Sequence, residues 1–182
     1  MTLVAGGDSI IWGSELADCP HGGINGYSRS TFSALLSDDY RCVAYPGISN
    51  KDIVVKVKNA IDTIKNTLVL VCWTWPTRDN KLDSDDEILD LQIYLEQLDI
   101  PYLFTCVDNC VVTNNPKIKW NNWYFFPPGK KIYETQRPRG FYQWAVENKY
   151  SVGLDGHPLE LAHRDAALLI KEKFDEMVTK SI

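Results

Sequence analysis

Four short runs of apolar residues have the length and composition of buried β-strands. They lie at residues 2–5, 40–45, 68–73 and 101–107. The third run, Leu68 to Trp73, shows no polar alternation, which is typical of a parallel strand covered on both faces. The first run ends at Gly6-Gly7-Asp8-Ser9 and the second at Pro46-Gly47, where turns are expected. The chain is therefore predicted to contain at least four strands.

Helical patterns separate these runs. A short helix is expected at residues 28–36, and a last helix at about residues 159–178. Ser49 and Ser84 each begin a sequence that resembles a capping box and precedes apolar residues on one helical face. Strands that alternate with helices predict right-handed crossovers. We expect a three-layer α/β/α sandwich around a central parallel sheet, as in flavodoxin-like folds.

The segment 114–150 interrupts this alternation, because it is rich in aromatic residues and contains four prolines. Two interpretations stay open. The segment packs its aromatic side chains on the sheet edge, or it forms a lid or wall over a binding site. At 182 residues, the chain is predicted to be one domain over 1–182 with this segment as an insertion.

Composition removes several classes of function. The net charge of −5 argues against nucleic acid as a partner, because phosphate binding needs clustered cations. No apolar run approaches the roughly 20 residues that span a bilayer, and the N-terminus lacks the features of a signal peptide. We therefore expect no membrane partner and a cytoplasmic location. The five cysteines lack the CxxC spacing of zinc sites, so we expect reduced thiols and no metal.

Candidate site residues follow the ends of the predicted strands. Ser9 follows the first strand, Gly47 and Asn50 follow the second, and Thr74 follows the third. In open parallel sheets, sites form at the carboxyl ends of the strands. Asp155 and His157 precede the last helix, in Asp155-Gly156-His157-Pro158. A serine on a strand-to-helix turn, a histidine and an acid are the parts of an acyl-transfer triad.

These motifs resemble the SGNH hydrolases, also called the GDSL esterase/lipase family, over nearly the whole chain. The resemblance implies that Ser9 is the nucleophile and that the Ser9 and Gly47 amides form the oxyanion hole. It also implies that His157 is the general base and that Asp155 orients it. The block around Trp73 and Trp75 is further similar to a divergent branch seen among phage-encoded hydrolases. A phage origin would allow an association with the virion.

The sequence departs from the family pattern at two places. The third block usually reads Gly-x-Asn-Asp, whereas this chain has Cys72-Trp73-Thr74-Trp75-Pro76-Thr77-Arg78. Thr74 is the candidate for the third oxyanion donor. Arg78 is expected either to compensate for the missing Asn, to bind an anionic substrate group, or to lie in solvent.

The second departure concerns the acid. Asp155 precedes His157 by two positions, where the family commonly has three, and Asp108 is the alternative acid. His163 is expected to cap or pack the last helix, and His21 to be a loop residue. The candidate substrate-binding residues are Asn50, Trp73, Trp75 and Arg78.

The favoured function is therefore a serine esterase that hydrolyses an O-acetyl or short acyl ester, for example on a carbohydrate, without a cofactor. One alternative is an inactive or weakly active carbohydrate-binding module on the same fold. Another is a flavodoxin-like flavin protein, although residues 6–9 contain little Ser or Thr for phosphate binding. The oligomeric state is not predicted.

Overall fold

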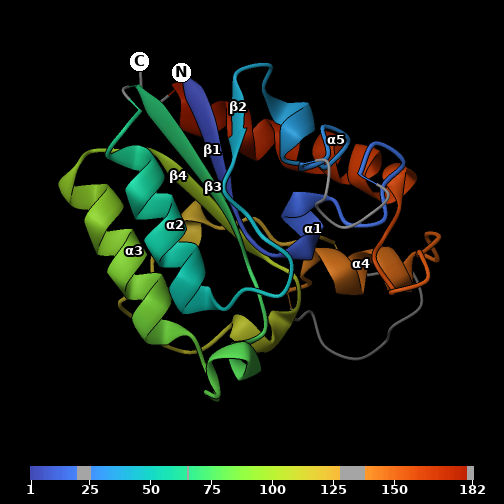
Figure 1. The fold of residues 1–182 in the computed structure, drawn as a ribbon. Helices are drawn as coiled ribbons and strands as arrows, with labels where there is room; N and C mark the ends of the chain where they lie inside the picture. Colours follow the sequence, from blue (N-terminus) through green and yellow to red (C-terminus); the bar gives the residue numbers. More distant parts are fainter. Residues whose placement is uncertain (20–25, 65, 128–137, 180–182) are drawn as a thin grey trace.

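A computed structural model describes residues 1–19, 26–64, 66–127 and 138–179 of this single-domain protein. Its centre is a sheet of four parallel strands in the order β2-β1-β3-β4 (Figure 1). The strands are β1 (Thr2–Gly6), β2 (Tyr40–Cys42), β3 (Thr67–Trp73) and β4 (Tyr102–Cys106). All four lie in the predicted apolar runs, so the predicted α/β sandwich is confirmed.

The helices connect the strands and extend beyond the sheet. The longer ones are α2 (Asn50–Ile61), α3 (Asp85–Gln97), α4 (Phe141–Glu147) and α5 (Glu160–Thr179). The short elements are α1 (Ser9–Trp12) and the 3₁₀ turns η1 (Ala34–Leu36), η2 (Pro76–Asp79), η3 (Asn109–Val111) and η4 (Trp120–Asn122). The segment 28–36 was predicted to be a helix, but it forms turns and η1, and the hydroxyls of Thr31 and Ser33 bond locally there.

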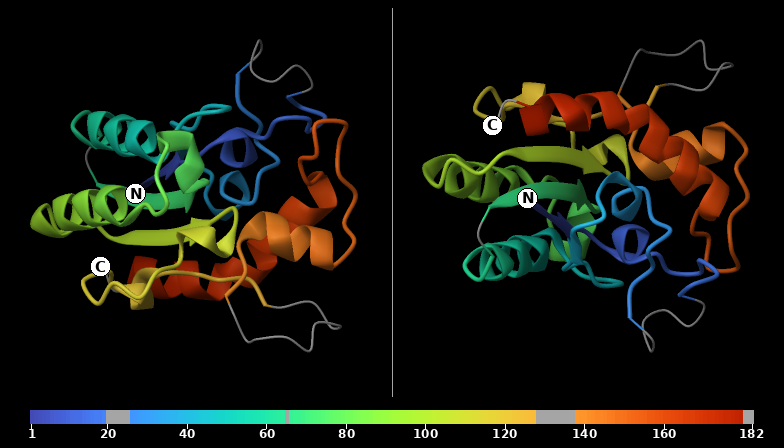
Figure 2. Two further views of the ribbon diagram at one scale, coloured as in Figure 1. Left: turned by 90° about the horizontal axis from the view of Figure 1, so that it is seen from below. Right: turned by 90° about the horizontal axis from the view of Figure 1, so that it is seen from above.

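The side chains of β3 divide the core into two layers. Leu68, Leu70 and Cys72 pack in the cluster that includes α5, whereas Val69, Val71 and Trp73 pack in the cluster that includes α2 and α3. Successive residues of a strand point to opposite faces, and both faces of this strand are covered. Figure 2 shows α5 on the other side of the sheet from α2 and α3.

The two predicted capping boxes have different outcomes. The Ser49 side chain accepts a hydrogen bond from the Asp52 amide and caps α2, as expected. Ser84 precedes α3 but makes no side-chain cap, because its hydroxyl accepts a hydrogen bond from Asn50 instead.

The aromatic segment contributes to the core where the structure describes it. Trp123 pairs with Phe104 at the β4 edge, and Phe126, Phe141 and Trp144 are buried in the α5 layer. These contacts favour the packing interpretation for residues 114–127 and 138–150. Residues 128–137 lie outside the described residues, so the lid interpretation stays a prediction.

The order of the strands indicates that a site lies at the carboxyl ends of the strands. The chain leaves β1 for β2 on one side, and returns through α2 to β3 on the other side of β1. Such a reversal opens a crevice at the carboxyl ends of the two inner strands. Ser9 begins α1 directly beyond the end of β1.

None of the helices within residues 1–19, 26–64, 66–127 and 138–179 is long and apolar enough to cross a membrane. Across the same residues, which include all five cysteines, there is no disulfide and no group of three His, Cys, Asp or Glu side chains that could hold a metal ion.

Candidate active site

Ser9 sits on a sharp turn between β1 and α1. The Asp8 side chain caps α1 by accepting a hydrogen bond from the Ile10 amide at 3.0 Å. A Cβ on Gly7 would lie 2.5 Å from the Ile11 side chain, so only glycine fits this close approach. Gly13 ends α1 in a left-handed conformation and donates its amide to the Ser9 carbonyl. The serine is therefore held at the amino end of a short, rigid helix.

The structure brings His157 to Ser9 across 148 positions of sequence. The Ser9 Oγ and the His157 Nε2 are 2.9 Å apart, a hydrogen-bonding distance. The His157 side chain is 21% exposed, so this pair is accessible from solvent. A serine hydroxyl in contact with an imidazole nitrogen is the arrangement that proton removal by a general base requires.

The acid beside the histidine is Glu15. Its Oε2 lies 2.8 Å from the His157 Nδ1, on the opposite side of the ring from Ser9. The exposed Asp155 contributes its backbone instead, because its amide donates to the Glu15 Oε1 at 2.9 Å. Within the described residues, no hydrogen bond joins the Asp155 carboxylate to His157. The assignment of Asp155 as the acid therefore does not match the geometry, which places Glu15 there.

Glu15 also organises the loop that carries His157. Besides the imidazole and the Asp155 amide, its carboxylate accepts a hydrogen bond from the His157 amide at 3.1 Å. A Cβ on Gly153 would lie only 2.4 Å from the Glu15 Oε1, so a glycine there leaves room for the carboxylate. Burial alone would raise the pKa of Glu15, but these hydrogen bonds outweigh it and lower the pKa below its usual value. The carboxylate is thus held in its charged form.

The Ser9 and Gly47 backbone amides are the predicted oxyanion donors. Within the described part of the chain, no protein group accepts a hydrogen bond from the Ser9 or the Gly47 amide. Gly47 has a φ of 78°, which favours glycine, and it lies in an exposed turn after β2. The Tyr45 amide donates to the Gly7 carbonyl at 3.2 Å and so connects this turn to the one before Ser9.

Thr74 and Asn50 do not match the roles predicted for them. The Thr74 hydroxyl donates to the Asp8 Oδ2 at 2.7 Å, and Thr74 is completely buried. The Asn50 amide group donates to the Thr74 carbonyl and the Ser84 hydroxyl, and its oxygen accepts from the Thr74 amide. Asn50 is also completely buried. Both side chains hold the strand ends together and are not available to a substrate.

The other predicted residues divide between the core and the site's surroundings. Trp73 is completely buried and packs edge-on against Phe104, so it does not contact substrate. Trp75 is half-buried, in edge contact with Tyr142, and the Arg78 guanidinium lies over its ring. Arg78 also reaches the Asp8 carboxylate.

Asp108 and His163 bond to groups other than Ser9 and His157. Asp108 caps η3 by accepting from the Cys110 amide, and within the described residues no hydrogen bond joins it to His157. His163 is buried between Phe32 and Phe141, and its Nδ1 accepts a hydrogen bond from the Phe32 amide. This agrees with the expectation that His163 packs α5. His21 lies outside the described residues.

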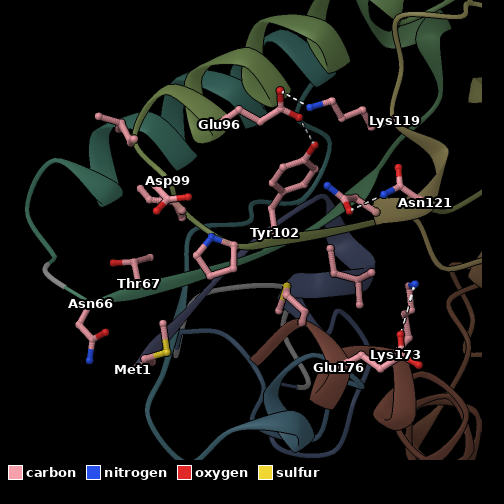
Figure 3. A pocket seen from close by; sticks show the side chains of 16 residues that line it. Met1, Asn66, Thr67, Glu96, Asp99, Tyr102, Lys119, Asn121, Lys173 and Glu176 are labelled. Carbon is pink, nitrogen blue, oxygen red and sulfur yellow. Dashed lines mark hydrogen bonds and ion pairs between the residues drawn. The ribbon is translucent and has the colours of Figure 1, made fainter. Parts of the chain in front are cut away.

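A hollow lies at the other end of the sheet from Ser9. Figure 3 shows it where β3 and β4 begin, with Thr67 and Tyr102 in its wall. Two of its charged side chains form an ion pair, since Glu96 binds the Lys119 ammonium as well as the Tyr102 hydroxyl, each at 2.8 Å. Because no nucleophile and base meet there, we place the candidate active site at Ser9 and His157.

Comparisons with known proteins give a distant structural likeness to an esterase. No protein-family model matches the chain, and no curated protein matches its sequence. Among solved structures, a mutant of the esterase AlinE4 is similar, with a TM-score of 0.40 and 16% identity. The match covers 60% of this chain and 61% of that one.

Proposed function

We propose that this protein is a serine ester hydrolase and a divergent member of the SGNH family. One observation carries the proposal: an unbroken hydrogen-bonded series runs from the Ser9 hydroxyl through His157 to the Glu15 carboxylate. Nucleophile, base and orienting acid are identified by these roles and not by their order in the chain.

In the proposed reaction, the Ser9 Oγ attacks the ester carbonyl while His157 Nε2 takes its proton. The Glu15 carboxylate accepts a hydrogen bond from the His157 Nδ1–H and stabilises the imidazolium that forms. The Ser9 and Gly47 amides donate to the oxyanion of the tetrahedral intermediate. His157 then protonates the departing alcohol, and water hydrolyses the acyl-enzyme with His157 again as the base.

The proposed substrate is a small ester, such as an O-acetyl group on a carbohydrate. Half-buried and exposed aromatic side chains surround α1, including Trp12, Tyr27 and Tyr45, which meet edge to face. Such rings offer flat apolar faces of the kind that commonly line ligand sites.

A binding module without turnover is the second candidate, and one observation favours it. The hydroxyl of Thr74 is bonded to Asp8, so the family's third oxyanion donor has no counterpart at that position. Loss of one such donor costs about 10²–10³-fold in turnover elsewhere. The two candidates therefore differ in rate, and a rate measurement separates them.

Hydrolysis of p-nitrophenyl acetate tests the proposal. We expect turnover by the wild type above the rate of free imidazole, and loss of that turnover to a similar degree in Ser9→Ala and His157→Ala, because triad members act as a unit. Ser14→Ala, which changes a buried serine just after α1, is the matched control and should retain activity. A folded wild type without Ser9-dependent turnover would favour the binding module.

A further inference from the structure

Arg78 lies between the two chain segments that provide the proposed oxyanion hole. Its Nη1 donates to the Ile48 carbonyl at 3.2 Å, and its Nη2 lies 3.3 Å from the Asp8 Oδ2. Ile48 follows Gly47, and Asp8 precedes Ser9. One guanidinium therefore contacts the residue adjacent to each proposed donor.

The neighbouring residue of η2 makes a parallel connection. The Asp79 Oδ2 accepts a hydrogen bond from the Asn50 amide at 2.9 Å, at the start of α2. Arg78 itself is positioned by its own backbone hydrogen bond to Trp75 and by stacking of its guanidinium over the Trp75 ring. Arg78 and Asp79 of η2 thus connect the segments that follow β1 and β2.

The positive charge of Arg78 lies next to the buried carboxylate of Asp8. Asp8 is completely buried and adjacent to the proposed nucleophile. Its other partners, the Ile10 amide and the Thr74 hydroxyl, are neutral. Arg78 is thus the cation that the structure places on this carboxylate, and its side chain is 25% exposed. A buried carboxylate without a cation would oppose the negative charge that develops on the oxyanion.

We infer that Arg78 is a positioning residue of the active site: it neutralises Asp8 and fixes the spacing of the Ser9 and Gly47 amides, in place of the family's third oxyanion donor. This inference rests on the proposed function. It assigns Arg78 to the enzyme's own electrostatics and not to an anionic group of the substrate.

A double-mutant cycle with a neutral substrate tests the inference. For Arg78→Met, we expect kcat for p-nitrophenyl acetate to fall about 10- to 100-fold, with KM changed less than about threefold. Adding Asp8→Asn removes the unpaired charge, so the double variant should recover most of the lost kcat. A residue with a merely structural role would not be rescued by removal of a second charge.

Arg29→Met is the matched control. Arg29 also donates to two backbone carbonyls, of Tyr40 and Asp38, and lies over an aromatic ring at 5.3 Å, the same distance as in Arg78 and Trp75. Its contacts are away from Ser9, so kcat should stay near the wild-type value. Should Arg78→Met fail to fold, Arg78→Lys keeps the cation and is expected to be folded with at least about a tenth of the wild-type kcat.

The outcomes separate the inference from the proposed function. A wild type without Ser9-dependent turnover would remove both. An active wild type would overturn the inference alone in any of three cases: Arg78→Met keeps full kcat, the Asp8→Asn addition restores nothing, or a folded Arg78→Lys is as inactive as Ser9→Ala.

Discussion

Glu15 connects His157, the proposed general base, to the rest of the proposed site through one carboxylate. It is six residues from Ser9, in a left-handed backbone conformation with a φ of 68°. That unusual conformation, which costs roughly 1 kcal/mol or more for a non-glycine residue, directs the side chain toward the loop 153–157. The carboxylate then receives two backbone amides as well as the imidazole. We therefore propose that Glu15 orients His157.

Substitution of the two acids separates their roles. Glu15→Gln should lower kcat about 10²–10⁴-fold, because a neutral amide stabilises the imidazolium poorly and can impose the wrong tautomer. Asp155→Asn should change kcat less than about threefold, because its contact with Glu15 is made by the backbone. Steady-state hydrolysis of p-nitrophenyl acetate measures both. The reverse order would return the acid to Asp155.

At the scale of elements, the site depends on loops that lie beyond the carboxyl ends of the strands. The loop 151–159 is closed by hydrogen bonds from the Gly153 amide to the His157 carbonyl and from the Leu159 amide to the Ser151 carbonyl. Glu15 enters this closed loop from the segment after α1. The position of His157 is thus set by hydrogen bonds within the loop and by the carboxylate of Glu15, which lies outside the loop.

Gly153→Ala should separate catalysis from folding. The new Cβ would crowd the Glu15 carboxylate and move it from His157, so kcat should fall about tenfold or more. The free energy of unfolding should fall by no more than about 2 kcal/mol, because the crowded atoms end a flexible side chain. Urea titration and steady-state kinetics measure the two effects.

The neighbouring Leu154→Ala is the control for this loop. The Leu154 side chain is fully exposed, so its removal should change neither quantity. If Gly153→Ala kept the wild-type kcat, the carboxylate position would not matter for turnover.

At the scale of the whole molecule, the sequence pattern predicted the architecture better than it predicted the site. All four strands, α2, α3 and α5 lie where the apolar patterns placed them, because burial of one face or stripe dictates those patterns. Ser9 and His157 were singled out by motif, and the structure brings them together. The contact between Glu15 and His157 had no local signal, because it depends on tertiary packing of two segments 142 positions apart.

The burial of side chains near the site was also not predictable from the sequence. Asn50, Trp73 and Thr74 follow or end strands, where functional side chains are common, yet all three are completely buried. A sequence pattern places a residue at the edge of a sheet but does not show whether neighbouring polar groups already use its side chain. Here the hydrogen bonds among Asp8, Asn50 and Thr74 do so.

Global stability should depend on pH through His163. Burial lowers the pKa of His163 to about 3, although a backbone hydrogen bond at Pro158 opposes this shift. The folded protein therefore keeps His163 neutral, while the unfolded chain takes up a proton near its usual pKa of about 6.5. The stabilising contribution is complete above that value and decreases as pH falls toward 3.

Between about pH 7.5 and pH 5, this effect should cost the wild type about 2 kcal/mol of unfolding free energy. His163→Gln should lack that part of the slope, although it will be less stable at neutral pH because a buried ring is lost. Urea unfolding at both pH values measures the difference. Equal slopes in the two proteins would show that His163 does not titrate on unfolding.

Intact-mass labelling with a fluorophosphonate tests the central claim most directly, because the probe reacts with a serine activated by a neighbouring base. We predict one adduct per wild-type chain, no adduct on Ser9→Ala, and labelling of Glu15→Gln slowed at least about tenfold. Asp155→Asn should label at the wild-type rate. A folded wild type that takes up no probe, or a Ser9→Ala variant that is labelled as fast as the wild type, would contradict the account.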